Sequence, residues 1–182
     1  MKFVIIGAGI VGLSIAETLI KKEIVSPNNL VILDKYSVPS DGTSTHNSGV
    51  LHAGLYYKPG SLKAKLSIDG GHKLKEWCFK NDLPILKCGK LLVPFDQKDL
   101  KRLDEIFDNA TKNGCEVLKI DYSEAVKLQP GICKQEKYLW SPKTAVFSPH
   151  LIMRRLFKLL KEKGVEFHRK GVLLDDESNK RL

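Results

Sequence analysis

Two short runs of hydrophobic residues stand near the amino terminus, at residues 3–6 and 30–33, and polar residues or glycine bound each run. Runs of this length, rich in β-branched residues, are typical of buried strands, which we expect within 2–6 and 28–35. Between them, apolar residues recur at helical spacing from about Ile10 to Lys22. The pattern therefore predicts a strand, a helix and a second strand, the order of a βαβ unit with parallel strands.

The remaining chain alternates between helical and extended patterns. Helices are expected over 66–83, about 97–112, 123–130 and 150–163, and extended segments over 87–96, 114–121, 138–149 and 165–174. The strand expected within 87–96 should end at Pro94. Ser148 is placed to cap the last helix, with Pro149 at its first position and Gly164 ending it. On this helix, Met153 and Phe157 are predicted to be core residues.

Residues 35–61 break the alternation, because they are rich in Ser, Thr, Gly and Pro and show no clear period. The composition predicts a long loop. Long loops inside compact domains are usually functional, although a solvated surface connection remains the alternative. The stretch HNSGVLHAG, residues 46–54, adds two histidines and an asparagine to this loop.

Composition and charge narrow the class of protein. With 182 residues, 42% hydrophobic and 28% charged, the chain resembles an ordinary globular protein with room for one sizeable core. The formal charge of +9 comes from lysines scattered along the chain rather than from one dense block. A nucleic-acid interface would cluster them, so we expect no nucleic-acid partner and a surface that suits anionic ligands.

The cysteine spacing and the hydrophobic segments argue against a disulfide scaffold, a metal site and a membrane-spanning protein. Cys78, Cys88, Cys115 and Cys133 show no CxxC spacing, which predicts free thiols in a reducing compartment, and no metal-ligand cluster is visible. The apolar amino terminus resembles a signal peptide, but its ordered glycines argue against that interpretation. No segment is apolar over the length of a bilayer span. We expect a cytoplasmic protein, with peripheral contact with the inner membrane left open.

The turn between the first strand and helix carries the motif GAGIVG, which matches GxGxxG at Gly7, Gly9 and Gly12. In this motif the first glycine permits a tight turn, the second lets the backbone approach a pyrophosphate, and the third lets the helix pack close to the strand. Asp34 ends the second strand, where a carboxylate accepts hydrogen bonds from ribose hydroxyls and disfavours a 2′-phosphate. Together these features predict a dinucleotide-binding unit that binds NAD or FAD rather than NADP.

The loop that follows favours FAD. The segments GAGIVG, LDK, THNSGVLHAGLYYKPGSLKAKL and CGKLLVP resemble the amino-terminal half of the D-amino-acid-oxidase-like (DAO) family of FAD oxidoreductases, and most specifically its L-2-hydroxyglutarate oxidase and dehydrogenase branch. One departure is Asp34, where many members carry glutamate. The resemblance implies an α/β fold in which a Rossmann-like FAD-binding domain carries an inserted α+β substrate domain. It implies a first FAD-binding segment at residues 1–86, part of the substrate domain at 87–147 and a return to the FAD-binding domain at 148–182, with the strand after Gly164 beside the strand ending at Asp34.

The resemblance also implies which residues bind the cofactor. Thr43 to Gly49 would follow the diphosphate and flavin, and a residue near Val172 would contact adenine through its backbone. The full implied set is Gly7, Ala8, Gly9, Ile10, Val11, Gly12, Asp34, Lys35, Thr43, Ser44, His46, Asn47, Ser48, Gly49, Val50 and Val172.

The implied reaction is the oxidation of a 2-hydroxy acid, L-2-hydroxyglutarate to 2-oxoglutarate, by hydride transfer to flavin N5 while a base takes the hydroxyl proton. Histidine suits the role of base because its pKa lies near neutrality. His52 is the first candidate and His46 the second, while Tyr56 and Tyr57 are candidates for orienting a carboxylate. The other histidines, His72, His150 and His168, are expected to be surface or core residues.

Two alternatives stay open: a related FAD enzyme that acts on an amino acid or glycerol 3-phosphate, and a non-catalytic nucleotide-binding remnant. Members of the family are about twice as long, so the chain is expected to be a fragment, a truncated product or one half of a split protein. It would then be inactive alone and need a carboxyl-terminal half or a complementary chain. The electron acceptor is left open between oxygen, a quinone and a protein carrier.

Overall fold

The computed structural model describes residues 1–36 and 42–169. Contacts group the chain into two units, residues 1–48 with 148–182, and residues 49–147. The family resemblance predicts the first division after residue 86 instead. The contacts move it earlier because residues 50–51 and 85–86 both pair with the strand at 145–147, so residues 49–86 pack with the segment that follows them.

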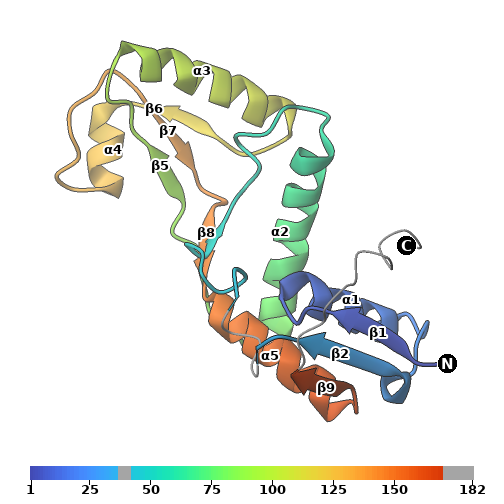
Figure 1. Cartoon of the computed structure of the whole chain (residues 1–182). Helices are drawn as coiled ribbons and strands as arrows, with labels where there is room; N and C mark the ends of the chain where they lie inside the picture. Colours follow the sequence, from blue (N-terminus) through green and yellow to red (C-terminus); the bar gives the residue numbers. More distant parts are fainter. Residues whose placement is uncertain (37–41, 170–182) are drawn as a thin grey trace. The chain divides into compact units, whose positions relative to one another are not determined.

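The first unit is built on a parallel sheet in the order β1-β2-β9, formed by β1 (Phe3–Ile6), β2 (Leu30–Asp34) and β9 (Glu166–Arg169). The helices α1 (Ile10–Lys21) and α5 (Pro149–Glu162) pack against each other beside this sheet, and a 3₁₀ turn (Pro27–Asn29) leads into β2 (Figure 1). The predicted βαβ unit is confirmed, and so is the return of the strand after Gly164 to the side of β2.

The core of the first unit lies between α1, α5 and β2. Leu13 and Ala16 of α1 are fully buried, as are Leu30 and Ile32 of β2. Helix α5 buries one face at helical spacing, made of Ile152, Met153, Leu156 and Leu160. Burial of Met153 agrees with its prediction as a core residue, and Phe157 packs edge-on against Phe167 of β9 with ring centroids 4.5 Å apart.

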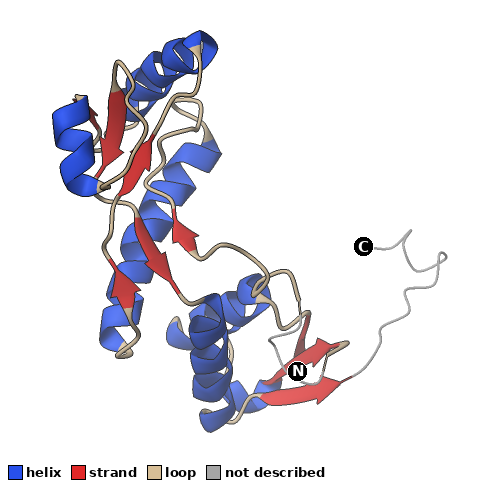
Figure 2. Ribbon diagram, turned by 90° about the vertical axis from the view of Figure 1, so that its left-hand side faces the viewer, coloured by secondary structure: helices blue, strands red, loops and turns tan. Residues whose placement is uncertain are grey.

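The second unit holds two antiparallel sheets, in the orders β3-β8-β4 and β5-β7-β6. Their strands are among those drawn in red in Figure 2. Its elements in chain order are β3 (Val50–Leu51), α2 (Leu62–Lys80), β4 (Ile85–Leu86), β5 (Lys90–Leu92), α3 (Gln97–Lys112), β6 (Leu118–Ile120), α4 (Tyr122–Leu128), β7 (Tyr138–Ser141) and β8 (Ala145–Phe147). Helix α2 begins at Leu62, earlier than expected, because the Ser61 hydroxyl accepts a hydrogen bond from Ala64 N at 3.2 Å and caps the helix.

Alternate side chains of β7 pack on opposite faces of the β5-β7-β6 sheet. Leu139 is fully buried in a cluster with Leu103 and Ala110 of α3, whereas its neighbour Tyr138 is fully buried in a second cluster with Ala125 of α4. Successive side chains of a strand point to opposite faces, so α3 and α4 cover opposite faces of this sheet.

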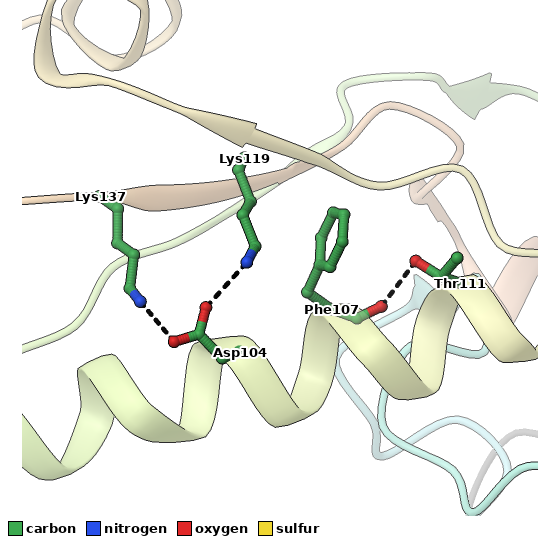
Figure 3. Close-up of polar contacts among 5 residues, drawn as sticks. All are labelled: Asp104, Phe107, Thr111, Lys119 and Lys137. Atoms are coloured by element: carbon green, nitrogen blue, oxygen red, sulfur yellow. Dashed lines mark hydrogen bonds and ion pairs between the residues drawn. The ribbon is translucent and has the colours of Figure 1, made fainter.

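Polar contacts tie α3 to the sheet as well (Figure 3). The Asp104 carboxylate accepts from Lys119 Nζ of β6 at 2.9 Å and from Lys137 Nζ at 2.5 Å. The hydrogen bond from Lys137, followed by that from Lys119, lowers the pKa of Asp104. Lys119 Nζ also lies 4.6 Å from the centroid of the Phe107 ring, one turn further along the helix.

Two further observations concern the whole of the described chain. Across residues 1–36 and 42–169, no helix combines the length and apolar character needed to cross a bilayer. All four cysteines are free thiols, Cys78 buried, Cys115 half-buried and Cys88 and Cys133 exposed.

Candidate functional site

The turn between β1 and α1 depends on two glycines. Gly7 adopts a φ of 104°, which side chains disfavour, and its N–H donates to Leu33 O of β2 at 2.7 Å. At Gly12, in the first turn of α1, an added Cβ would lie 2.0 Å from Gly7 O and 3.2 Å from the Ile5 side chain. The helix therefore starts against the end of the strand because neither position carries a side chain.

Asp34 is hydrogen-bonded to this turn. One carboxylate oxygen accepts from Ala8 N at 2.5 Å, and the other accepts from Tyr36 N at 2.8 Å. A carboxylate has about four acceptor sites, so acceptor capacity remains for a further donor. The carboxylate thus fixes the turn and still presents acceptors beside it.

The amino terminus of α1 is open to an anion. No acidic residue lies in its first turn, and no side chain of its N-cap residue, Gly9, covers the helix end. The Ser44 hydroxyl accepts a hydrogen bond from Ile10 N at 2.9 Å and lies 3.1 Å from the position of a Cβ at Gly9. A hydroxyl that accepts from the helix still has a proton to donate, so Ser44 and the helix end together suit a negatively charged group.

These groups line a pocket of about 700 Å³, within the range of cofactor sites. Predicted residues in its lining are Gly7, Ala8, Gly9, Asp34, Lys35, Thr43, Ser44 and His46. The pocket is also lined by residues that the sequence did not predict as cofactor residues: Ile6, Leu33, Tyr36, Gly42 and Met153. Four of these residues, Ile6, Leu33, Tyr36 and Gly42, stand in the sequence beside or close to motif residues, and this position could have identified them. Met153 belongs to α5, far along the sequence from the motif, so no such signal was present for it.

Other predicted cofactor residues do not contribute to the lining. Ile10, Val11 and Gly12 lie in the first turn of α1, and Asn47 donates from its side chain to Ser44 O at 2.8 Å. Ser48 ends the first unit, and Gly49 and Val50 belong to the second unit. Val172 lies outside the described residues. For all of these residues, cofactor contact remains a prediction.

His46 is exposed, and its Nδ1 lies 2.9 Å from Gly42 O. A carbonyl can only accept, so Nδ1 carries the proton and Nε2 is left as the acceptor of the neutral ring. The ring thus closes the loop of residues 42–46 at the edge of the pocket, and its Nε2 is free of that contact.

His52 follows β3 in the second unit and lines a separate, smaller cavity. Partial burial, followed by the charge of Lys90, lowers the pKa of His52. Its ring meets the Tyr56 ring edge-on, with centroids 6.3 Å apart, and Lys90 Nζ lies 4.7 Å from the centroid of the same tyrosine ring. At neutral pH these surroundings favour the neutral imidazole, the form that accepts a proton.

The remaining predicted residues have simpler environments. Tyr57 lies under the Lys63 ammonium, 4.9 Å from its ring centroid, and its carbonyl accepts from the Asn113 side chain. His72, His150 and His168 are exposed. Within residues 1–36 and 42–169, no three His, Cys, Asp or Glu side chains group closely enough to hold a metal ion.

The first unit has a parallel βαβ arrangement, a glycine turn, an acidic residue at the end of its second strand and a serine hydroxyl at the start of its helix. These features define a dinucleotide-binding domain of the α/β class. The family model described as FAD dependent oxidoreductase, DAO, matches residues 2–180. The chain belongs to this family, whose cofactor is FAD.

Several curated relatives share one name. L-2-hydroxyglutarate dehydrogenase of Caenorhabditis briggsae, a mitochondrial protein, is 38% identical over 170 residues, covering 92% of this chain and 37% of the relative. The protein of the same name from Escherichia coli K12 is 32% identical over 164 residues, covering 90% of this chain and 38% of the relative. The chain thus spans less than two fifths of the length of these relatives.

Solved structures agree on the fold. L-α-glycerophosphate oxidase of Mycoplasma pneumoniae, solved with FAD bound, superposes with a TM-score of 0.77 at 22% identity, covering 92% of this chain and 44% of that one. L-proline dehydrogenase of P. horikoshii gives a TM-score of 0.79 at 18% identity, covering 97% of this chain and 46% of that one. The expected fold class, a Rossmann-like FAD-binding domain that is partial relative to the family, is confirmed.

Proposed function

We propose that this chain forms the FAD-binding part of an enzyme that oxidises a 2-hydroxy acid, L-2-hydroxyglutarate, to the 2-oxo acid. The observation that carries the choice of substrate is that relatives 38% and 32% identical over nine tenths of the chain are both named L-2-hydroxyglutarate dehydrogenase. Glycerophosphate and an L-amino acid appear in the names of structures that are 22% and 21% identical, which support the fold alone.

The pocket residues fit the ADP half of the cofactor. The Asp34 carboxylate, which keeps acceptor capacity beyond its two backbone bonds, would hold the ribose hydroxyls. Ser44 and the end of α1 would hold the diphosphate, and Gly9 leaves the space that its backbone needs to approach. Bound FAD supplies the two-electron acceptor for the oxidation. Residues 47–50 would continue along the cofactor toward its flavin.

In this proposal His52 takes the proton of the substrate hydroxyl. The lowered pKa of His52 keeps the ring neutral at physiological pH, and an adjacent cation, Lys90, opposes its protonation in the absence of substrate. His46 is the second candidate, since its Nε2 is the acceptor of a ring fixed by Gly42 O. Residues 49–147 would supply part of the substrate site, and the reduced cofactor would pass its electrons to oxygen, a quinone or a protein carrier.

The cofactor assignment is tested by titrating the flavin-free protein with FAD and following quenching of flavin fluorescence. Asp34→Asn removes the charge that the ribose hydroxyls would meet, and we expect its Kd to rise about tenfold or more. The control is Asp108→Asn, an exposed carboxylate of α3 in the other unit, which should leave the Kd unchanged. No saturable FAD binding by the wild-type protein would refute the proposal.

The substrate and base are tested by anaerobic bleaching of the bound flavin in the chain joined to the carboxyl-terminal part of a curated relative. L-2-hydroxyglutarate is expected to bleach it, and D-2-hydroxyglutarate, glycerol 3-phosphate and L-amino acids are not. His52→Gln should slow bleaching by about 10²–10⁴-fold with FAD affinity unchanged. His150→Gln, an exposed histidine in the first turn of α5, is the matched control. Faster bleaching by glycerol 3-phosphate or an amino acid would reassign the substrate, and an unaffected rate in His52→Gln would exclude this residue as the base.

A further inference from the structure

The second unit contains a cavity of about 180 Å³ apart from the nucleotide pocket. One wall is a single face of α2, where Ile68, Gly71 and Lys75 recur at helical spacing. The opposite walls are the segment 51–53 after β3, the segment 114–116 after α3, and Lys143 in the turn between β7 and β8. The cavity is smaller than usual cofactor sites, so it suits a small molecule.

Lys75 gives the cavity a cation without a counterion. Its side chain is half-buried, and Nζ donates to Lys143 O at 2.8 Å. Among the described residues, no carboxylate lies within 4 Å of this nitrogen, because Glu116, the one carboxylate in the lining, pairs with Lys143 Nζ at 3.3 Å. Burial, then the charges of Lys143 and Lys87, lower the pKa of Lys75. A bound anion would relieve this unfavourable burial of charge.

Gly71 leaves the floor of the cavity open. Glycine inside a helix costs about 0.5–1 kcal/mol relative to alanine. Nothing in the packing of the described chain demands that cost, because a Cβ at Gly71 would meet only His52 O at 3.8 Å and Leu51 carbons at 4.0 Å, which are ordinary contacts. The residue is buried and lines the cavity, so the space that a methyl group would fill is space that a ligand can use.

We propose that this cavity binds a small organic carboxylate, with Lys75 as the anion anchor and Gly71 as the residue that keeps room for it. Leu51 and Ile68 line the same space and suit the carbon chain of such an acid, whereas they offer nothing to an inorganic anion. The carboxylate of Glu116 stands in the lining and opposes a phosphate, which concentrates its charge on one group, more than an organic acid that places one carboxylate beside Lys75. His52, the proposed base, stands in the same lining, but the binding itself requires neither FAD nor the proposed reaction.

The test is titration of the full chain, free of flavin, with sodium glutarate, followed by amide chemical shifts of α2 and by calorimetry. We expect saturable binding that shifts residues 68–75, and a loss of affinity of about tenfold or more in Lys75→Met. Lys75→Arg should retain most of it. The matched control is Lys73→Met, an exposed lysine of the same helix that does not line the cavity.

The glycine pair 70–71 provides a second, independent control for folding. Gly71→Ala should raise the melting temperature, since alanine favours the helix, and yet weaken glutarate binding by about tenfold because the methyl group takes ligand space. Gly70→Ala should raise the melting temperature equally and leave affinity unchanged, because its Cβ meets nothing within 4 Å. A higher melting temperature in both variants would show that weaker glutarate binding by Gly71→Ala does not come from a general loss of structure.

Four results would overturn the proposal: no saturable glutarate binding, equal affinity in Lys75→Met and wild type, equal affinity in Gly71→Ala and wild type, or inorganic phosphate binding as tightly as glutarate. Since the titration uses flavin-free protein, its outcome is separate from that of the FAD and bleaching experiments.

Discussion

Replacing Gly12 by alanine is expected to lower the stability of the nucleotide-binding unit, even in the absence of a cofactor. The added Cβ would lie 2.0 Å from Gly7 O, a backbone atom fixed by the hydrogen bond from Gly7 N to Leu33 O. Overpacking costs about 1–3 kcal/mol, and the upper end applies when backbone must move. Alanine returns about 1 kcal/mol of helix propensity, so the net loss is about 2 kcal/mol. For a chain of this size the melting temperature should fall by roughly 4–8 °C.

Gly9→Ala is the comparison that separates stability from binding. Gly9 has φ −71° and ψ 176°, an extended conformation that alanine also adopts, and its Cβ would meet only the mobile Ser44 hydroxyl at 3.1 Å. Thermal melts of the flavin-free proteins should therefore show a drop for Gly12→Ala and little change for Gly9→Ala. FAD titration should show at least a tenfold weaker Kd for Gly9→Ala, since the methyl group blocks the approach of the diphosphate. A Gly12→Ala protein that melts at the wild-type temperature would refute the steric argument.

Two further predictions concern the second unit. Tyr138→Phe should lower the urea midpoint by the equivalent of about 1–3 kcal/mol, because the buried hydroxyl donates to Cys133 O at 2.6 Å and accepts a second hydrogen bond from a backbone N–H; an unchanged midpoint would contradict it. The pKa of Asp104 is lowered in the folded protein by hydrogen bonds from Lys137 and then Lys119, so its ion pairs stabilise the fold above the ordinary pKa of aspartate, and this stabilisation is lost as the pH falls through the lowered folded value. Asp104→Asn should lack that loss of stability in acid, measured by urea unfolding at a series of pH values, and a profile parallel to wild type would count against the assignment.

Periodicity was sufficient for elements whose own residues decide them. The helix expected over about 97–112 is confirmed as α3, Gln97–Lys112. It could be predicted because its N-cap, Asp96, and the spacing of its buried residues both belong to the local sequence. The strands of the βαβ unit are equally local, since their hydrophobic runs are continuous and glycine ends the first. The extended segment 87–96 yields only β5, Lys90–Leu92, because its ends are set by pairing with β7 rather than by composition.

Tertiary contacts explain what the sequence pattern did not predict. Residues 35–61 show no period, yet they contain β3, because Val50 and Leu51 pair with Val146 and Ala145 nearly a hundred residues later. Met153 was predicted as a core residue, and it is, but the same side chain also lines the nucleotide pocket. A helical pattern assigns a residue to the buried face, and it carries no information on whether that face ends at a cavity.

The contact between Asp34 and Ala8 N shows that the acidic residue and the glycine turn form one structural element rather than two independent parts of a motif. Asp34 Oδ2, at the end of β2, accepts a hydrogen bond from Ala8 N of the turn. One residue earlier, Leu33 O accepts a hydrogen bond from Gly7 N. Two hydrogen bonds therefore join the turn to the end of β2, where the ligand would lie. Aspartate reaches Ala8 N directly. A longer glutamate would place its carboxylate one carbon further from the strand. The shorter side chain therefore fits this turn, because its carboxylate binds the backbone and keeps acceptor capacity for the proposed ribose contact.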